Sequence, residues 1–130
     1  MKKFGRVGLV AATTLVSTGL LFTQTASAVV KDTKCTLHNA GWIYCVYYQP
    51  ASVPAQGKIS VKLVSSGGKK VSLRLTDTSG NALATKKQVS PGGGYTLIWK
   101  NPNVNKSKPV RIQAKRHAVV DVKANLRYKY

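Results

Sequence analysis

Acidic residues are almost missing from this sequence of 130 residues. It contains no glutamate and only three aspartates, against 21 lysines and arginines, so its formal net charge is +18 at pH 7. General acid–base hydrolysis needs a pair of carboxylates in different environments, and a calcium loop needs clustered carboxylate oxygens. Because Asp32, Asp77 and Asp121 are scattered along the chain, we predict neither kind of site.

Histidine is equally scarce, with only His38 and His117. A serine triad through His117 and Asp121 is conceivable, but no serine lies in a nucleophile-elbow motif. A basic nuclease that uses both histidines is a further open alternative. His38 with Cys35 and Cys45 gives three possible zinc ligands, but the chain has no Cys-x-x-Cys pair and no second histidine at zinc spacing. We therefore predict a non-enzymatic protein with no catalytic residue, no metal site and no cofactor.

Long apolar runs are also lacking, except near the N-terminus. Lys2, Lys3 and Arg6 precede an apolar stretch over residues 7–22, which the small residues 26–28 follow. This order is typical of a secretory signal peptide, and the stretch is shorter than the roughly 20 residues of a membrane span. The leader resembles those of Gram-positive bacteria. We predict a cleavable signal peptide over residues 1–28, with a retained N-terminal anchor as the alternative, and a secreted or wall-associated protein.

Only two cysteines are present, Cys35 and Cys45. In an exported domain, two cysteines are more consistent with a disulfide than with a metal site. A bridge over this short loop contributes about 2–3 kcal/mol in the chain-entropy model. We predict a Cys35–Cys45 disulfide, and two free thiols are the alternative.

No stretch after Phe22 has the 3.6-residue period of a helix, whereas several alternate with a period of two. Such alternation is typical of half-buried antiparallel strands. Residues 29–130 are enough for one domain without a transmembrane segment. We predict an all-β fold, a small antiparallel β-sandwich of about seven short strands with immunoglobulin-like or jelly-roll-like topology. The expected strands are residues 41–48, 58–64, 70–76, 82–89, 95–99, 110–115 and 120–130.

The polar faces of these strands are basic. Three of the 21 bases fall in the leader, which leaves 18 bases against three acids and a formal net charge of +15. If the last two strands pair as a hairpin around His117, four bases share one face and repel each other unless an anion lies across them. These four are Arg111, Lys115, Lys123 and Arg127. The alternative is that edge lysines only discourage sheet-to-sheet aggregation.

Phenylalanine is absent after residue 22, so every later aromatic residue is a tryptophan or a tyrosine with a polar group. Such residues suit interfaces and can stack on flat ligands. We expect Trp42 and Trp99 to lie in the core. Tyr47, Tyr128 and Tyr130 are the candidates for exposure.

Together these features favour a non-enzymatic module that binds teichoic acid, acidic polysaccharide or extracellular DNA by charge. Binding to nucleic acid would be non-specific. The predicted binding residues are Lys62, Arg74, Arg111, Lys115, Lys123, Arg127, Lys129, Tyr128 and Tyr130.

Two other functions are open. One is an antimicrobial effector acting on anionic membranes or walls, since the general build resembles that of small exported bacteriocins of the β-sandwich type. The other is an inhibitor of an extracellular enzyme that presents the loop between Cys35 and Cys45.

Overall fold

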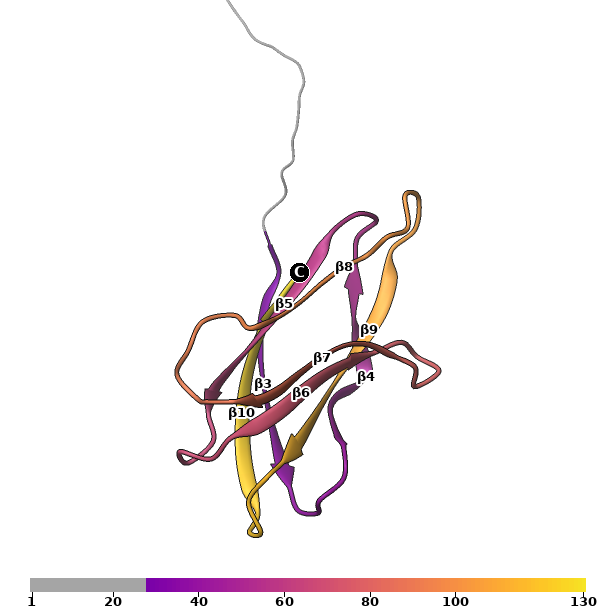
Figure 1. Ribbon diagram of the computed structural model, residues 1–130. Helices are drawn as coiled ribbons and strands as arrows, with labels where there is room; N and C mark the ends of the chain where they lie inside the picture. The colour runs from indigo at the N-terminus through magenta and orange to yellow at the C-terminus, as the bar shows by residue number, and fades with distance from the viewer. Residues whose placement is uncertain (1–27) are drawn as a thin grey trace, which may run out of the picture.

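Two four-stranded antiparallel sheets form the part of the protein that the computed structural model describes, residues 28–130 (Figure 1). The predicted signal peptide lies outside the described residues except for Ala28. No helix occurs in residues 28–130. The strands are β3 (Val30–Leu37), β4 (Ile43–Val53), β5 (Lys58–Ser65), β6 (Val71–Thr76), β7 (Ala82–Val89), β8 (Leu97–Lys100), β9 (Lys108–Arg116) and β10 (Val122–Lys129).

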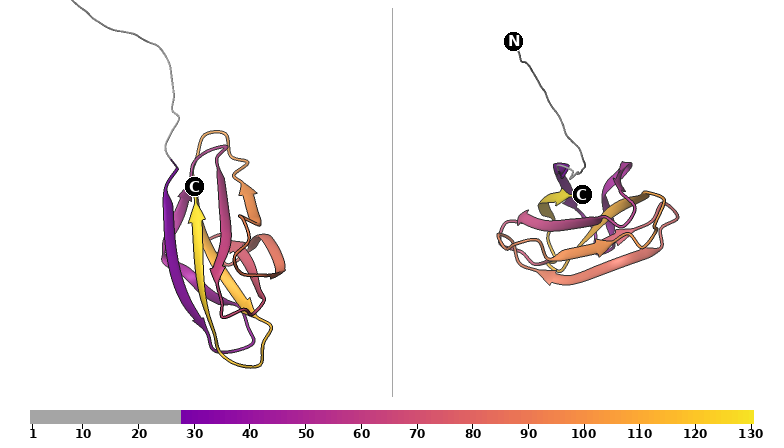
Figure 2. Two further views of the ribbon diagram at one scale, coloured as in Figure 1. Left: turned by 90° about the vertical axis from the view of Figure 1, so that its left-hand side faces the viewer. Right: turned by 90° about the horizontal axis from the view of Figure 1, so that it is seen from above.

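The strand order is β3-β10-β5-β8 in one sheet and β4-β9-β6-β7 in the other. The first sheet faces the viewer in the left view of Figure 2, and β6 and β7 cross it obliquely in Figure 1. The pairing is nested, because β3 pairs with β10, β4 with β9, β5 with β8 and β6 with β7. The chain therefore resembles one long hairpin that has been rolled into two layers.

The alternating sequence explains which face of each strand is buried. Val61 and Leu63 of β5, and Ala124 and Leu126 of β10, are almost completely buried between the sheets. The residues between them point outward, as a period of two requires. The predicted antiparallel β-sandwich is confirmed at this level, and each of the seven expected strands overlaps an observed one.

One strand was missed. Apolar and polar residues do not alternate in β3. Most of its side chains are exposed, and only Leu37 is buried. It is an edge strand that pairs with β10 alone, over the register from Val122 opposite Leu37 to Lys129 opposite Val30. Backbone hydrogen bonds and the cystine, rather than a buried side-chain face, hold it in place.

The predicted hairpin around His117 is wrong. β9 and β10 belong to different sheets, and the turn between them carries the chain across the sandwich. Alternation shows that Ile112 of β9 and Leu126 of β10 are buried. It does not show whether two such strands lie side by side or face each other across the core.

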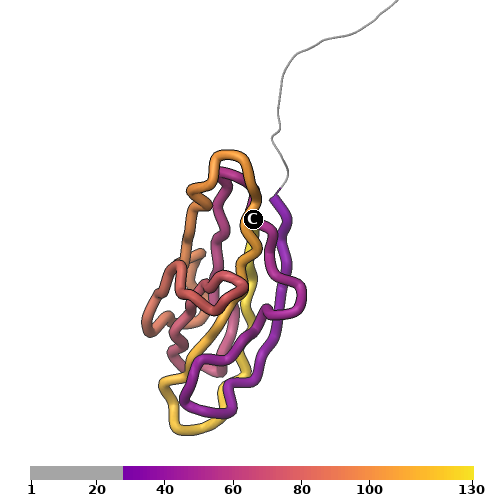
Figure 3. Tube along the Cα trace, turned by 90° about the vertical axis from the view of Figure 1, so that its right-hand side faces the viewer, coloured from indigo at the N-terminus to yellow at the C-terminus, as the bar shows by residue number. Residues whose placement is uncertain are grey.

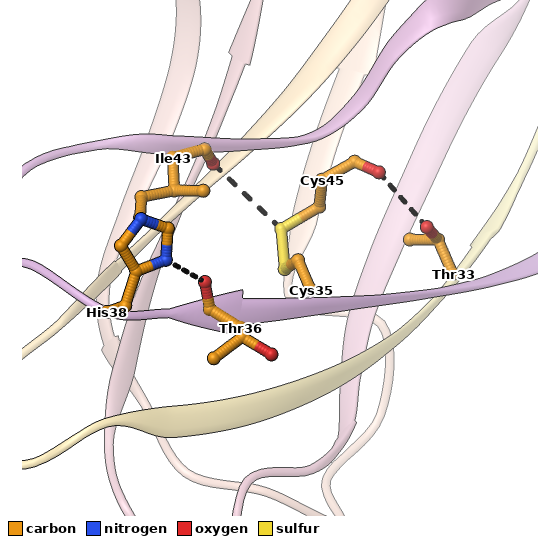
Figure 4. The surroundings of a disulfide bond; sticks show 6 residues. All are labelled: Thr33, Cys35, Thr36, His38, Ile43 and Cys45. Atoms are coloured by element: carbon orange, nitrogen blue, oxygen red, sulfur yellow. Dashed lines mark hydrogen bonds between the residues drawn. A yellow bond between two sulfur atoms is a disulfide. The ribbon is translucent and has the colours of Figure 1, made fainter.

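The two sheets are linked covalently by a disulfide between Cys35 of β3 and Cys45 of β4, as predicted (Figure 4). The two Cα atoms are 5.2 Å apart, within the usual range for a cystine. Beside it, the Thr33 hydroxyl donates a hydrogen bond of 3.0 Å to the Cys45 carbonyl. The cystine therefore connects the exposed edge strand of one sheet to the edge strand of the other.

Candidate functional site

The seven predicted binding cations divide between the two outer surfaces of the sandwich. We use the name basic face for the outer surface of the β3-β10-β5-β8 sheet, with Lys34, Lys62, Lys123, Arg127 and Lys129. The arginine–aromatic face is the outer surface of the β4-β9-β6-β7 sheet, with Trp42, Tyr44, Tyr47, Arg74, Arg111 and Lys115. The structure therefore does not bring Arg111 and Lys115 together with Lys123 and Arg127.

On the basic face, Lys62 of β5 lies opposite Arg127 of β10 in the strand register. Arg127 is balanced by Asp32 of β3, with a distance of 2.7 Å from Nε to the carboxylate. The hydrogen bond from Arg127 holds the pKa of Asp32 below its usual value, and the neighbouring charges of Arg127 and Lys62 act in the same direction. The ammonium groups of Lys62 and Lys129 lie 5.1 and 4.6 Å from the ring centre of Tyr95.

A shallow groove of about 490 Å³ lies along β3 and β10 on the same face. Its lining includes Lys34, Thr36, Lys123 and Asn125. Nothing in the sequence singles out Lys34, because β3 lacks the alternation that marks the other strands. Two lysines without an acidic partner therefore border this groove, next to neutral polar groups.

Arg74 is the central cation of the arginine–aromatic face. Its guanidinium lies over the Trp42 ring, 4.2 Å from the ring centre. Its Nε donates a hydrogen bond of 2.8 Å to the Gln113 side-chain oxygen on β9. The stack and this hydrogen bond leave both terminal nitrogens as donors for an anion.

Arg111 is held in the same way two positions further along the sheet. Its guanidinium stacks 4.0 Å from the centre of the Tyr47 ring. Its Nε and Nη1 donate hydrogen bonds to the carbonyls of Tyr47 and Thr78, at 3.2 and 3.0 Å. Lys115 lies at the other end of the row, 5.9 Å from the Trp42 ring centre.

No acid balances the arginine–aromatic face. In residues 28–130 only Arg116 and Arg127 form salt bridges, with Asp121 and Asp32 respectively. Arg74, Arg111 and Lys115 therefore remain uncompensated, although two of the three are fixed in position by aromatic rings.

The aromatic residues differ from expectation in two places. Tyr128 is only 5% exposed, so the prediction that its ring is exposed for stacking on a ligand is wrong. It points into the core because it continues the buried row of β10, and burial raises the pKa of its hydroxyl. Trp42 was expected in the core but is half-buried on the outer surface beneath Arg74.

The predictions for Trp99 and Tyr47 agree with the structure, whereas Tyr130, a candidate for exposure, is only partly exposed. Trp99 packs against the core, and Tyr47 is 40% exposed. Tyr130 is half-buried beside Tyr128, with nearly parallel rings 6.1 Å apart.

An irregularity in β4 brings two tyrosines to one side. The register with β9 shifts between Tyr44 and Val46, and again before Ala51. The bend is visible in the purple segment of Figure 3. Strict alternation would place Tyr44 and Tyr47 on opposite sides, yet their rings make an edge contact with centres 4.8 Å apart. The aromatic row therefore depends on a bulge that alternation does not predict.

The two histidines have local partners. His117 Nε2 lies 2.6 Å from the Ser72 hydroxyl, which also accepts the Gln88 amide hydrogen bond at 3.1 Å. Ser72 is almost fully buried, and Asp121 is paired with Arg116. This contact ties β6 to the turn before β10.

His38 Nδ1 lies 3.1 Å from the Thr36 carbonyl in the turn after β3. In residues 28–130 there is no group of three histidine, cysteine or acidic residues that could hold a metal ion. No helix in the same range is long and apolar enough to cross a membrane.

No family model and no curated protein matches the sequence. Among solved structures, the chain is similar to one in the capsid asymmetric unit of cyanophage Pam1, with 14% identity, a TM-score of 0.36, and 79% of this chain and 83% of that chain covered. It is also similar to the VP2 subviral particle of infectious bursal disease virus, with 10% identity and a TM-score of 0.33. That match covers 78% of this chain and 32% of the VP2 chain.

Proposed function

We propose that this protein is a secreted, non-enzymatic binding protein that associates with anionic polymers outside the cell. Teichoic acid, acidic polysaccharide and extracellular DNA share the repeating negative charges that its surface would neutralise. Each neutralised group releases counterions, so the affinity should fall steeply as salt rises.

The observation that carries the proposal is the state of the two arginines on the arginine–aromatic face. Arg74 and Arg111 are stacked on aromatic rings and hydrogen-bonded through Nε. Such groups lose little side-chain entropy when an anion binds. Arg74 has both terminal nitrogens for two parallel hydrogen bonds to a phosphate or carboxylate, whereas Arg111 already uses Nη1 and keeps Nη2. Because neither arginine has an acidic partner, an anion has no internal ion pair to displace.

The basic face contributes long-range attraction. Its lysines lie on neighbouring strands, and only Arg127 on this face is paired with an acid. Like charges in this arrangement repel one another across the sheet. A bound polyanion would relieve that repulsion, which gives the second surface a favourable electrostatic contribution.

Membrane activity is the alternative function, and one observation favours it. Val119 and Val120, adjacent in the turn before β10, are 93% and 53% exposed, and Tyr48 of β4 is 92% exposed; a tyrosine ring of this kind suits the interface between lipid and water. Dye leakage from anionic but not zwitterionic vesicles would support this function. Binding to anionic vesicles without leakage would favour polymer binding.

Two finer features belong to the same proposal. The nested strand pairing fits a jelly roll, two interlocked Greek keys, better than an immunoglobulin-like sandwich.

Export through a signal peptide ending at Ala28 would deliver the domain to its polymer. Mass spectrometry of the secreted protein should then find Val29 as the first residue.

Salt-graded binding to a fluorescent single-stranded oligonucleotide tests the proposal. The variant Arg74→Gln/Arg111→Gln/Lys115→Gln should lower the slope of log affinity against log salt by about 2, because each lost contact on single-stranded DNA is worth about 0.7. The matched control, Lys69→Gln/Lys70→Gln/Lys106→Gln, removes the same charge from exposed turns and should change the slope much less.

Two results would contradict the proposal. One is an equal loss of slope in both variants, which would mean that net charge alone acts. The other is retention on wall polymer or DNA at about 0.5 M NaCl, where the Debye length is only about 4 Å and a charge-driven contact should fail.

A further inference from the structure

We propose that one molecule of this protein bridges two separate anionic polymer strands, one on the basic face and one on the arginine–aromatic face. The inference rests on the proposed function and adds that each molecule has two separate polymer-binding surfaces. Its ligand is any linear polymer with repeating phosphate or carboxylate groups.

The opposite orientation of the two faces carries the argument. They are the outer surfaces of two sheets whose inner surfaces bury the shared core. Stacked sheets are about 10 Å apart, so side chains on the two faces point away from each other. A short, straight polymer segment that lies on one face cannot contact the cations of the other.

Each face has what it needs to hold a strand by itself. The basic face has the groove bordered by Lys34 and Lys123, with Lys62 further across the sheet. The other face has the two stacked arginines and Lys115. The two faces have no cation in common, so a polymer strand bound to one face leaves the cations of the other face free.

The rim between the edge strands β3 and β4 does not connect the faces electrostatically. A cavity of about 410 Å³ at this rim is lined mainly by neutral side chains, among them Thr33, Tyr47 and Tyr48, and Lys31 is the single base in its lining. The opposite rim, with Lys86 and Lys87 on β7, is basic and exposed. Wrapping of one long strand around that rim is the competing arrangement.

Energy transfer between two oligonucleotides separates these arrangements. Two single-stranded oligonucleotides, one donor-labelled and one acceptor-labelled, are mixed at low salt with the protein from Val29 to Tyr130. Each has about eight nucleotides, within the range of binding sites on small β domains. We expect energy transfer when the protein is limiting, its loss when the protein is in excess, and two strands per protein molecule in sedimentation.

Variants of single faces make the test specific. The variant Lys34→Gln/Lys62→Gln/Lys123→Gln and the variant Arg74→Gln/Arg111→Gln/Lys115→Gln should each still bind one labelled strand, measured by anisotropy, and show no energy transfer. The turn variant Lys69→Gln/Lys70→Gln/Lys106→Gln has the same net charge as both and should retain transfer. Circular dichroism and thermal unfolding show that each variant is folded.

The outcomes distinguish the two proposals. Absence of binding by the wild type would overturn the proposed function itself. Binding of one strand per protein without transfer, or transfer only in complexes that contain two protein molecules, would overturn bridging and leave the proposed function standing. Equal loss of transfer in all three variants would also overturn it, because the faces would then have no individual role.

Discussion

The disulfide between the sheets gives the most quantitative prediction. Cys35 and Cys45 are separated by ten positions, and closing a loop of that length restricts the unfolded chain. In the chain-entropy model the bridge is worth about 2.7 kcal/mol at 25 °C. The variant Cys35→Ser/Cys45→Ser should therefore lose about that amount in free energy of unfolding.

For a domain of this size, each 1 kcal/mol shifts the melting temperature by about 4–8 °C, so we expect a decrease of roughly 10–20 °C. Unfolding by heat and by urea, followed by tryptophan fluorescence, measures both quantities. Wild-type protein in excess reductant should match the variant, and the variant itself should not respond to reductant. A loss below about 0.5 kcal/mol would refute the reasoning, because the β3 and β4 edges would then be held without the bridge.

Three other predictions concern single side chains. Thr76 has a buried hydroxyl without a hydrogen-bond partner among the described residues, so Thr76→Val should raise the free energy of urea unfolding by up to about 1 kcal/mol; a decrease would show that the hydroxyl is satisfied. The Asn81 amide, the Asn81 side chain and the Ser79 amide donate hydrogen bonds to Asp77 and hold its pKa below the usual value. This stabilisation is present above about pH 4 and is lost as pH falls through the lowered pKa, so Asp77→Asn should flatten the decline of melting temperature below about pH 4, and an unchanged decline would contradict that origin. Trp42→Leu removes the platform under Arg74 and should weaken oligonucleotide binding about 2- to 5-fold, from a cation–π contribution of about 0.5–1 kcal/mol; unchanged affinity would show that the stack does not prepare Arg74 for an anion.

Much of the fold could be predicted from residue patterns alone. Alternation in β5, β6, β9 and β10 identified the strands and their buried faces, because burial of one face of a sheet requires a period of two. The cysteine count predicted the bridge. β3 was missed because its side chains are mostly exposed, and its place in the sheet comes from backbone pairing that composition does not record.

The candidate site depended more on tertiary structure. The basic residues on the strands could be recognised from the sequence, but their division between two surfaces could not, since alternation is the same for adjacent strands and for strands that face each other across a core. The aromatic partners of Arg74 and Arg111 are Trp42, directly before β4, and Tyr47 within β4, a strand that is distant in sequence and irregular in register. The excess of positive charge is thus a property of the sequence, whereas the choice of strand neighbours, made by packing of the core, decides which cations share a surface.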